Sequence, residues 1–226
     1  SNCRPMATIN YAAGDTLGFF ESNTNMWKCY MLRDKLQAAG HQVKMSRVQT
    51  GGLNDGAYDK PLSTIAMESE NWGSDYFISV HSNAHEDGST VNYPVYFYRG
   101  TDANNYVANS RNMCATAQPY LYDIHAQGME YASYTKPNIR GDISFWGTSL
   151  TTNGYTGYYG VLRHGDPGYL VEGYFHTYQP ARHRALNPDW CRQEGVRHYR
   201  GIAAWYGNTP ESKGYVMGDV RTKNQQ

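Results

Sequence analysis

Two short apolar runs constrain the fold of this 226-residue chain more than any other feature. They are YFISVH, which ends at His81, and YLVEGYF, which spans 169–175. Each is bounded by turn-forming residues, which is typical of strands buried on both faces of a parallel sheet. Segments with helical spacing alternate with these runs. The sequence therefore predicts an α/β fold with a mainly parallel central sheet, flanked by helices on both faces, in a single domain.

The remaining elements are predicted from apolar spacing and from turn residues. Pro119 should end one helix, and Pro188 suits the first turn of another. The stretch 122–156 is polar and irregular, and we expect loops there. The predicted helices are 22–39, 62–72, 103–118 and 188–207, and the predicted strands are 41–48, 76–81, 92–100, 158–163 and 169–175.

Charge and hydropathy exclude two classes of partner. Lys plus Arg and Asp plus Glu both total 20, and no basic cluster occurs, so we expect no nucleic-acid partner. No apolar run approaches the roughly 18–20 residues of a membrane span. The 21 tyrosines suit wet clefts lined by sugar or peptide, although surface positions on strands and loops explain them equally simply.

The four cysteines form no CxxC pair and no zinc-finger spacing. Cys29, Cys114 and Cys191 fall in predicted helices, where free thiols are expected. Cys3 lies in the loop-like start of the chain. Disulfides remain an open alternative if the protein is exported.

Three polar residues stand where α/β proteins place ligands, near the carboxyl ends of strands. His81 closes one apolar run, and Glu172 interrupts the other, where a buried acid is costly unless paired or functional. Glu21 lies where a loop enters the first helix and could cap that helix or point into a cleft. Taken singly, each also has an ordinary structural explanation.

Taken together, these residues resemble a known family. The segments GFFESNTNMWKCYMLRDKLQAAGHQVKMSR, NWGSDYFISVHSNA and GYLVEGYFHTYQPARHRALN are similar to zinc-dependent N-acetylmuramoyl-L-alanine amidases of the amidase 3 family. The resemblance spans roughly residues 14–207, and SVHSNA and VEGYFH are its specific motifs. We therefore expect an amidase catalytic domain over 1–208, with 209–226 as a linker or the start of a following domain.

The resemblance implies a mechanism and a substrate. Glu21 and His81 match zinc ligands, and Glu172 matches the catalytic acid that serves as general base to zinc-activated water. The implied substrate is the amide between N-acetylmuramic acid and L-alanine in peptidoglycan. Asn83 should organise the loop after His81 or touch substrate. Arg140 and Arg163 are candidate anchors for peptide carboxylates, with structural ion pairs as the equal alternative.

One ligand of the family pattern is missing. Family members carry a further histidine in a GHGG-like turn before the acid matched by Glu21, whereas this sequence has no histidine before His41. Either Ala13 stands in its place and the metal is lost, or the first strand lies upstream of Ser1. We favour the second explanation, because a buried central strand should be a strong apolar run and none precedes Glu21.

Other histidines are weaker candidates. His85 follows His81 by four residues, but the segment leaves a strand for a loop, so helical ligand spacing does not apply. His164 could line the cleft or be an ordinary turn residue. We expect His41, His176 and His183 at loop or helix surfaces.

Two rival functions remain. The chain could be a metal-free pseudoenzyme that binds peptidoglycan, or a zinc carboxypeptidase-like peptidase, which the lack of an HxxE pair disfavours. The resemblance further implies an exported protein, in the periplasm or cell envelope or outside the cell, since peptidoglycan lies outside the cytoplasmic membrane. We expect a monomer.

Overall fold

The computed structural model describes residues 21–48, 59–86, 89–125 and 138–209. The helices are α1 Glu21–Ala38, α2 Leu62–Trp72, α3 Ser110–His125, α4 Asp142–Trp146, α5 Gln179–Ala185 and α6 Pro188–Trp205, with a 3-10 turn, η2, at Gly160–Leu162. The strands are β1 Phe77–Asn83, β2 Val95–Tyr98, β3 Ile139–Gly141, β4 Leu150–Thr152, β5 Tyr155–Gly157 and β6 Gly168–Phe175.

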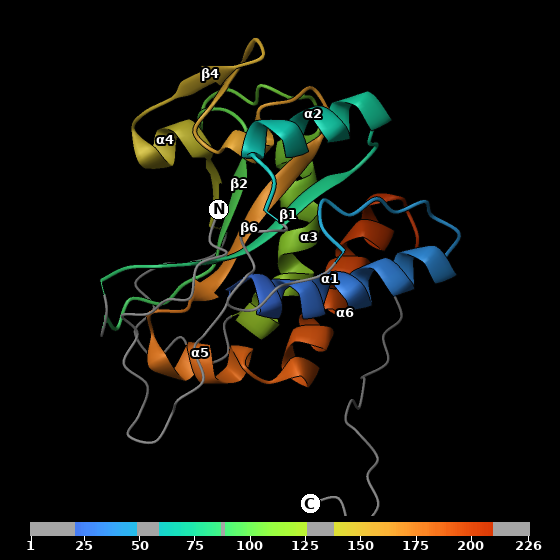
Figure 1. The fold of residues 1–226 in the computed structure, drawn as a ribbon, viewed down its shortest axis with the longest axis vertical. Coiled ribbons are helices and arrows are strands. Elements are labelled where there is room, and N and C mark those ends of the chain that lie inside the picture. The colour runs from blue at the N-terminus through green and yellow to red at the C-terminus, as the bar shows by residue number, and fades with distance from the viewer. Residues whose placement is uncertain (1–20, 49–58, 87–88, 126–137, 210–226) are drawn as a thin grey trace, which may run out of the picture.

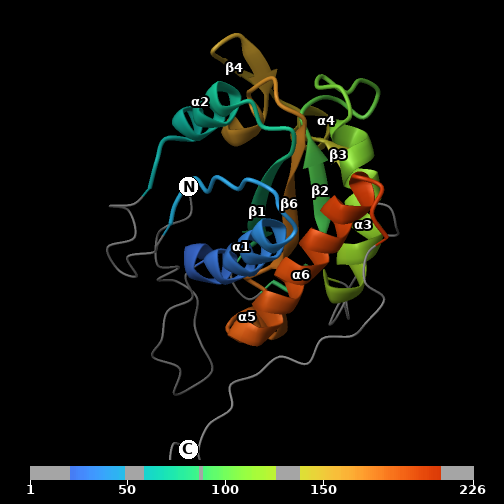
Figure 2. The ribbon, with the colours of Figure 1, turned by 90° about the vertical axis from the view of Figure 1, so that its right-hand side faces the viewer.

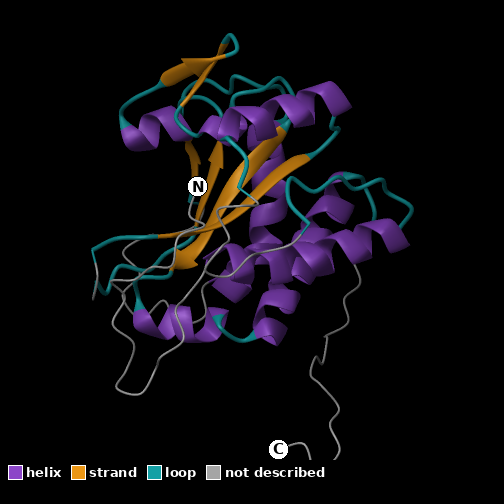
Figure 3. Cartoon of the chain, in the orientation of Figure 1, coloured by secondary structure: helices purple, strands orange, loops and turns teal. Residues whose placement is uncertain are grey.

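Four strands form the central sheet in the order β1-β6-β2-β3 (Figures 1 and 3). β1 pairs parallel with β6, β2 pairs parallel with β3, and β2 pairs antiparallel with β6. The predicted α/β class is confirmed, with one antiparallel pairing that makes the sheet mixed. β4 and β5 form a separate hairpin at the end of the molecule near α2 and α4 (Figures 1 and 2).

Strand β6 is buried along its whole length and divides the core into two halves. Tyr169 and Val171 face α3 and pack with Tyr96 and Leu121. Leu170 faces the opposite side, where β2, α2, α4 and η2 contribute apolar side chains. Figure 2 shows the sheet standing between α3 and α2, while α1 and α6 lie together along its lower part. Alternation along one strand thus places Glu172 on the face opposite α3.

Most long elements agree with the sequence prediction. The helices predicted at 22–39, 62–72 and 188–207 are α1, α2 and α6, and Pro188 does open α6. The runs at 76–81 and 169–175 are β1 and β6. β1 is only partly buried, however, because it lies at the edge of the sheet that the described residues form.

Two predicted strands are wrong. Residues 41–48, all within the described part of the chain, form neither helix nor strand, and alternate residues of this segment are exposed. The run at 158–163 contains the 3-10 turn η2, whose Val161 and Leu162 are buried in the core. Burial of a short apolar run is compatible with either structure, so periodicity alone could not separate them.

The predicted helix at 103–118 also needs correction. α3 begins only at Ser110, after Asn109 in a left-handed conformation at φ 71°, and it continues through Pro119 to His125. Proline removes one helical hydrogen bond. The apolar face on both sides of Pro119 is buried, at Met113, Leu121 and Ile124, and that burial offsets the loss.

The polar stretch 122–156 contains more structure than predicted. It holds the end of α3, then β3, α4 and the β4–β5 hairpin, while residues 126–137 lie outside the described part of the chain. The short helix α5 was not predicted at all. Elements of three to seven residues are too short for periodicity to reveal them.

Cys29, Cys114 and Cys191 lie in helices and are free thiols, as predicted, whereas Cys3 lies outside the described residues. Within the described ranges, none of the helices combines the length and apolar character that crossing a membrane requires.

Candidate active site

The register between β1 and β6 places His81 directly opposite Glu172. The pairing then shifts, because Asn83 lies opposite Phe175 rather than one residue earlier. Such a bulge re-aims nearby groups and is common beside active sites. Two of the residues singled out in the sequence, about ninety positions apart, are therefore brought together by backbone hydrogen bonds of adjacent strands.

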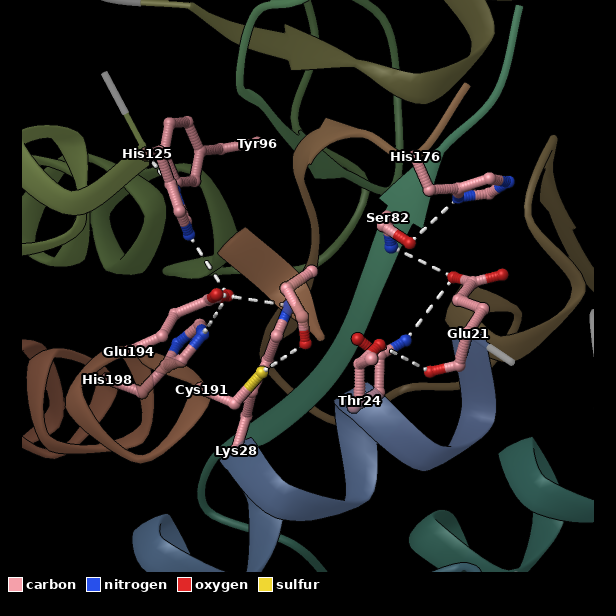
Figure 4. A network of polar contacts seen from close by, with 12 residues as sticks. Glu21, Thr24, Lys28, Ser82, Tyr96, His125, His176, Cys191, Glu194 and His198 are labelled. Atoms are coloured by element: carbon pink, nitrogen blue, oxygen red, sulfur yellow. Dashed lines mark hydrogen bonds and ion pairs between the residues drawn. The ribbon is translucent and has the colours of Figure 1, made fainter. Parts of the chain in front are cut away.

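Glu21 joins this pair from the first turn of α1. Its side chain is 2% exposed, and its Oε1 lies 3.2 Å from His81 Nδ1. The Ser82 backbone N–H donates to the same oxygen at 2.8 Å, and Asn25 Nδ2 donates at 3.3 Å (Figure 4). The other oxygen, Oε2, is buried without a hydrogen-bond partner. Glu21 is thus held in place through one oxygen while the second stays available.

His81 has polar neighbours on both ring nitrogens. Nδ1 faces Glu21, and Nε2 lies 2.9 Å from Ser79 Oγ. If Nε2 donates to Ser79, the Nδ1 lone pair faces a carboxylate and needs a cation between them. If Ser79 donates instead, Nδ1–H donates to Glu21. In both arrangements the ring plane is fixed by its two neighbours.

Charges in this cluster shift each other's pKa values. Burial alone would raise the pKa of Glu21, but the hydrogen bond and charge of His81 outweigh it and lower that pKa to about 2. Burial likewise disfavours the charged His81 ring, yet its hydrogen bond to Glu21 raises the pKa of His81. In contrast, burial raises the pKa of Glu172 to about 8, against the opposing charge of His81. One carboxylate is thus held ionised and the other tuned towards proton transfer at neutral pH.

Tyr159 also reaches this cluster, although sequence reasoning did not select it. Its hydroxyl donates to Glu172 Oε1 at 3.5 Å and accepts from Trp146 Nε1 at 3.1 Å. The second oxygen of Glu172 is buried without a hydrogen-bond partner, and the residue is 7% exposed. One of 21 tyrosines carries no distinguishing sequence signal. The signal that could have found it is its place in YYGVLR, just before the turn that leads into β6.

His176 lies behind Glu21 rather than at the surface, so its predicted surface position is wrong. The ring is 1% exposed, and Nδ1 lies 2.9 Å from Ser82 Oγ (Figure 4). Because Ser82 also donates its N–H to Glu21, this serine links the two side chains. Burial lowers the pKa of His176. It follows β6 directly, so the strand carries it inward.

Asn83 is the last residue of β1, and His85 lies in the loop that follows. Asn83 Oδ1 accepts from the Ala84 N–H at 2.8 Å, and its backbone oxygen accepts from the His176 N–H at 2.9 Å. These bonds fit the predicted role of Asn83 in organising the loop. His85 donates its backbone N–H to Thr177 Oγ1.

The two arginines make internal contacts. Arg140 forms an ion pair with Asp102 at 2.9 Å, on a strand two positions from β6 in the sheet. The guanidinium of Arg163 donates to Thr152, Gly157 and Tyr158. Arg140 thus forms the structural ion pair of the alternative, whereas the acceptors given for Arg163 are uncharged oxygens. Contact of either arginine with substrate stays a prediction.

The remaining candidate histidines lie away from the cluster. His164 is 1% exposed, accepts the Asp166 N–H and packs edge-on against Phe77 at 4.5 Å. It is therefore an interior residue, and burial lowers its pKa. The rings of His41 and Tyr206 contact at a tilt of 34°, with centroids 5.6 Å apart, and His183 is exposed on α5.

A second buried charge cluster, which was not predicted from the sequence, lies beside the first. Lys28 Nζ, on α1, lies 3.0 Å from Glu194 Oε2 on α6, with both side chains fully buried. His125 Nε2 and His198 Nε2 lie 3.0 and 3.7 Å from Glu194 Oε1 (Figure 4). Burial alone would raise the pKa of Glu194, but Lys28 and His125 outweigh it and lower that pKa well below its usual range.

The donors Glu21 and His81 can be tested for zinc. Two ligands bound to one tetrahedral zinc at ordinary bond lengths lie about 3.4 Å apart. His81 Nδ1 and Glu21 Oε1 lie 3.2 Å apart, a distance that a direct hydrogen bond also explains, so the fit rests on donor type: imidazole nitrogen and carboxylate oxygen are ordinary zinc donors. The described ranges contain no group of three or more metal-ligating side chains. The fit therefore covers two ligands.

This α/β domain brings together a histidine and two carboxylates, one with a lowered pKa and one with a raised pKa. Such an arrangement is a feature of hydrolytic enzymes. The sequence identifies the family: the profile of the amidase 3 family, N-acetylmuramoyl-L-alanine amidase, matches residues 10–204. The chain belongs to this family of peptidoglycan hydrolases. None of the proteins with curated descriptions matches the sequence.

Solved structures agree with this assignment at the level of the fold. The apo N-acetylmuramyl-L-alanine amidase Ami1 from Mycobacterium abscessus aligns with a TM-score of 0.65 and 15% identity, over 91% of this chain and 82% of that chain. The catalytic domain of the amidase CwlV from Bacillus (Paenibacillus) polymyxa var. colistinus aligns with a TM-score of 0.61 and 16% identity, over 83% of this chain and 86% of that chain. An N-acetylmuramoyl-L-alanine amidase from Clostridium difficile 630 aligns with a TM-score of 0.59 and 19% identity, over 88% of this chain and 89% of that chain.

Proposed function

We propose that the protein is a zinc-dependent peptidoglycan amidase that hydrolyses the amide between N-acetylmuramic acid and L-alanine. Glu21 and His81 are the proposed zinc ligands, and Glu172 is the proposed general base. The observation that carries the proposal is the register of β1 and β6, which places His81 opposite Glu172. Glu21 Oε1 lies 3.2 Å from Nδ1 of the same histidine. Because its substrate lies outside the cytoplasmic membrane, we propose that the protein acts there.

Zinc, when bound, would polarise the scissile carbonyl and make water more acidic. Glu172 would take a proton from the attacking water and pass it to the leaving nitrogen of L-alanine as the carbon–nitrogen bond breaks. Its raised pKa suits both steps, since the carboxyl must gain and lose a proton near neutral pH. Tyr159 would hold Oε1 of Glu172 and leave Oε2 to face the substrate.

Two variants test these roles separately. Glu172→Ala should lose amide cleavage on muropeptides by at least about 100-fold while keeping its fold and its zinc. His81→Ala should lose zinc, measured by metal analysis after dialysis against a zinc buffer. His85→Ala is the matched control, because that histidine lies four residues further on and should change neither property. Wild-type turnover by Glu172→Ala would refute the assignment of the base.

The alternative is a metal-free peptidoglycan-binding pseudoenzyme. It is favoured by one observation: the described residues supply two of the three expected protein ligands. It predicts no zinc by metal analysis, no release of peptide from sacculi, and retained binding to sacculi. Release of a shortened stem peptide, with the muramoyl amide intact, would instead indicate a peptidase.

A further inference from the structure

A pocket of about 510 Å³ opens beside the candidate active site. It lies between the first turn of α2, the β4–β5 hairpin and η2, at the end of the molecule where Figure 1 shows α2 and β4. The described side chains that matter for its chemistry are Leu62, Ser63, Thr152, Tyr158, Tyr159 and Arg163. Its wall is thus a mixture of hydroxyls, aromatic rings and aliphatic groups.

An aromatic shelf, formed by Trp146, Tyr158 and Tyr159, adjoins this pocket. The rings of Trp146 and Tyr158 are stacked, with centroids 4.8 Å apart and an interplanar angle of 15°. Trp146 remains 40% exposed, which is unusual for so large an apolar side chain. Each ring thus covers one face of the other, and the part of Trp146 that stays exposed offers an apolar surface whose orientation is fixed by this stack.

The shelf is connected to the candidate general base by hydrogen bonds. Trp146 Nε1 donates to the Tyr159 hydroxyl at 3.1 Å, and that hydroxyl donates to Glu172 Oε1 at 3.5 Å. Trp146 is consequently connected to the carboxylate of Glu172 through one residue, Tyr159. The shelf therefore adjoins the candidate general base.

Charge indicates what this surface binds. Arg163 is the one charged residue among the described residues that line the pocket, and all three of its guanidinium nitrogens donate to protein oxygens. The acceptors are Thr152 Oγ1 at 2.8 Å, the Gly157 carbonyl at 3.1 Å and the Tyr158 carbonyl at 2.6 Å. Three of the five N–H groups of Arg163 are thus engaged within the protein, and the other polar side chains of the pocket are neutral hydroxyls, which suit an amphipathic ligand rich in hydroxyl and amide groups.

We propose that the aromatic shelf and its pocket bind the glycan strand of peptidoglycan. The apolar C–H face of a hexosamine ring would stack on the Trp146–Tyr158 surface, and the sugar hydroxyls and acetamido groups would meet Ser63, Thr152 and Tyr159. The stem peptide would then leave the site on another side. This inference rests on the proposed substrate, and it specifies which part of that substrate the shelf recognises.

The test uses two probes with the full chain: chitotetraose, a neutral oligomer of N-acetylglucosamine, and a synthetic stem peptide that begins with L-alanine. Isothermal titration should detect chitotetraose binding that Trp146→Ala weakens by about tenfold, the scale of one aromatic stacking contact. Tyr158→Ala should weaken it similarly, whereas Tyr158→Phe keeps the ring and should retain it. Trp72→Ala is the matched control, because Trp72 is 42% exposed but lies at the far end of α2.

Two outcomes would overturn the inference: chitotetraose affinity unchanged in folded Trp146→Ala and Tyr158→Ala, or wild-type protein that binds the stem peptide but not chitotetraose. Binding needs neither metal nor turnover, so the two proposals fail separately. An inactive protein whose chitotetraose binding depends on Trp146 would refute the amidase activity alone. If the protein is active but Trp146→Ala binds chitotetraose as tightly as the wild type does, only the proposed glycan subsite is refuted.

Discussion

Helix α1 contributes one charged residue to each of two buried clusters, and the clusters differ in how fully their charges are paired. Lys28 and Glu194 are completely buried, and both oxygens of Glu194 face cationic or imidazole nitrogens. In the first turn of α1 the situation differs: Glu21 and Glu172 each have one buried oxygen for which the described residues supply neither a hydrogen bond nor an ion pair, and the His81 side chain is 29% exposed. The closed cluster has the character of a structural element, and the incomplete one that of a site awaiting a ligand.

Removing one charge from the closed cluster should have the largest effect on stability. Lys28→Met leaves Glu194 buried without its lysine and should lower the free energy of unfolding by about 3–5 kcal/mol in urea denaturation. The double variant Lys28→Met/Glu194→Gln should recover part of this loss. Lys35→Met, on the same helix but less buried, is the control and should change stability by less than about 1 kcal/mol.

The same variants also separate structure from catalysis. Turnover per folded Lys28→Met molecule should fall far less than turnover of Glu172→Ala. A Lys28→Met protein as stable as the wild type would remove the contrast between the two clusters.

Gly173 joins the two regions and should give an intermediate effect. It follows Glu172 on β6, and a Cβ there would lie 2.7 Å from His125 Nε2. Gly173→Ala should therefore push His125 away from Glu194 and cost about 1–3 kcal/mol of stability by overpacking. Because the same strand carries Glu172, cleavage per folded molecule should fall as well. Unchanged denaturation midpoints would show that His125 moves aside freely.

The pH dependence of the open cluster should give a graded effect, which is small across any one pH unit. In metal-free protein, burial raises the pKa of Glu172 from its ordinary value of 4.5 to about 8. Between these values the folded protein holds a proton that the unfolded chain has lost, so stability falls as pH rises. The loss approaches at most about 1.4 kcal/mol per pH unit.

Glu172→Gln removes this titration. In chelator, the variant should be about as stable as the wild type near pH 4 and increasingly more stable than it towards pH 8, measured by urea denaturation at each pH. A constant difference between the two proteins across this range would contradict the raised pKa.

The sequence predicted the long elements of the fold because their signals are local. An apolar run of strand length or a helical apolar face reports burial directly, which explains the success with α2, α6, β1 and β6. Helix α1 is different, because three of its five buried residues are polar or charged: Glu21, Thr24 and Lys28. The failures have two physical causes. Short elements such as α4 and η2 offer too few residues for a period, and α3 crosses Pro119 because tertiary burial outweighs a local penalty.

For the candidate site, the sequence selected Glu21, His81 and Glu172, and the fold brings these three together. It could not select Tyr159, His176 or the cluster around Lys28. Their environments arise from contacts between segments far apart in the chain, such as Lys28 with Glu194. A charged residue that is buried on a polar helix does not alter the apolar spacing of that helix. The groups that pair with its charge come from other segments, as Glu194 does for Lys28.

The alternation of side chains along β6 also limits where this chain can change in length. Leu170, Glu172 and Tyr174 face one side of the sheet, while Tyr169, Val171 and Gly173 face the other. Inserting or deleting a single residue within the strand would exchange these sets, so that Glu172 and the glycine under His125 would both turn to the wrong face of the sheet. Insertions at the exposed turn between β4 and β5 would disturb neither. Among related sequences, differences in length should therefore be most frequent in that hairpin, beside the aromatic shelf. There they would alter substrate choice without altering the chemistry.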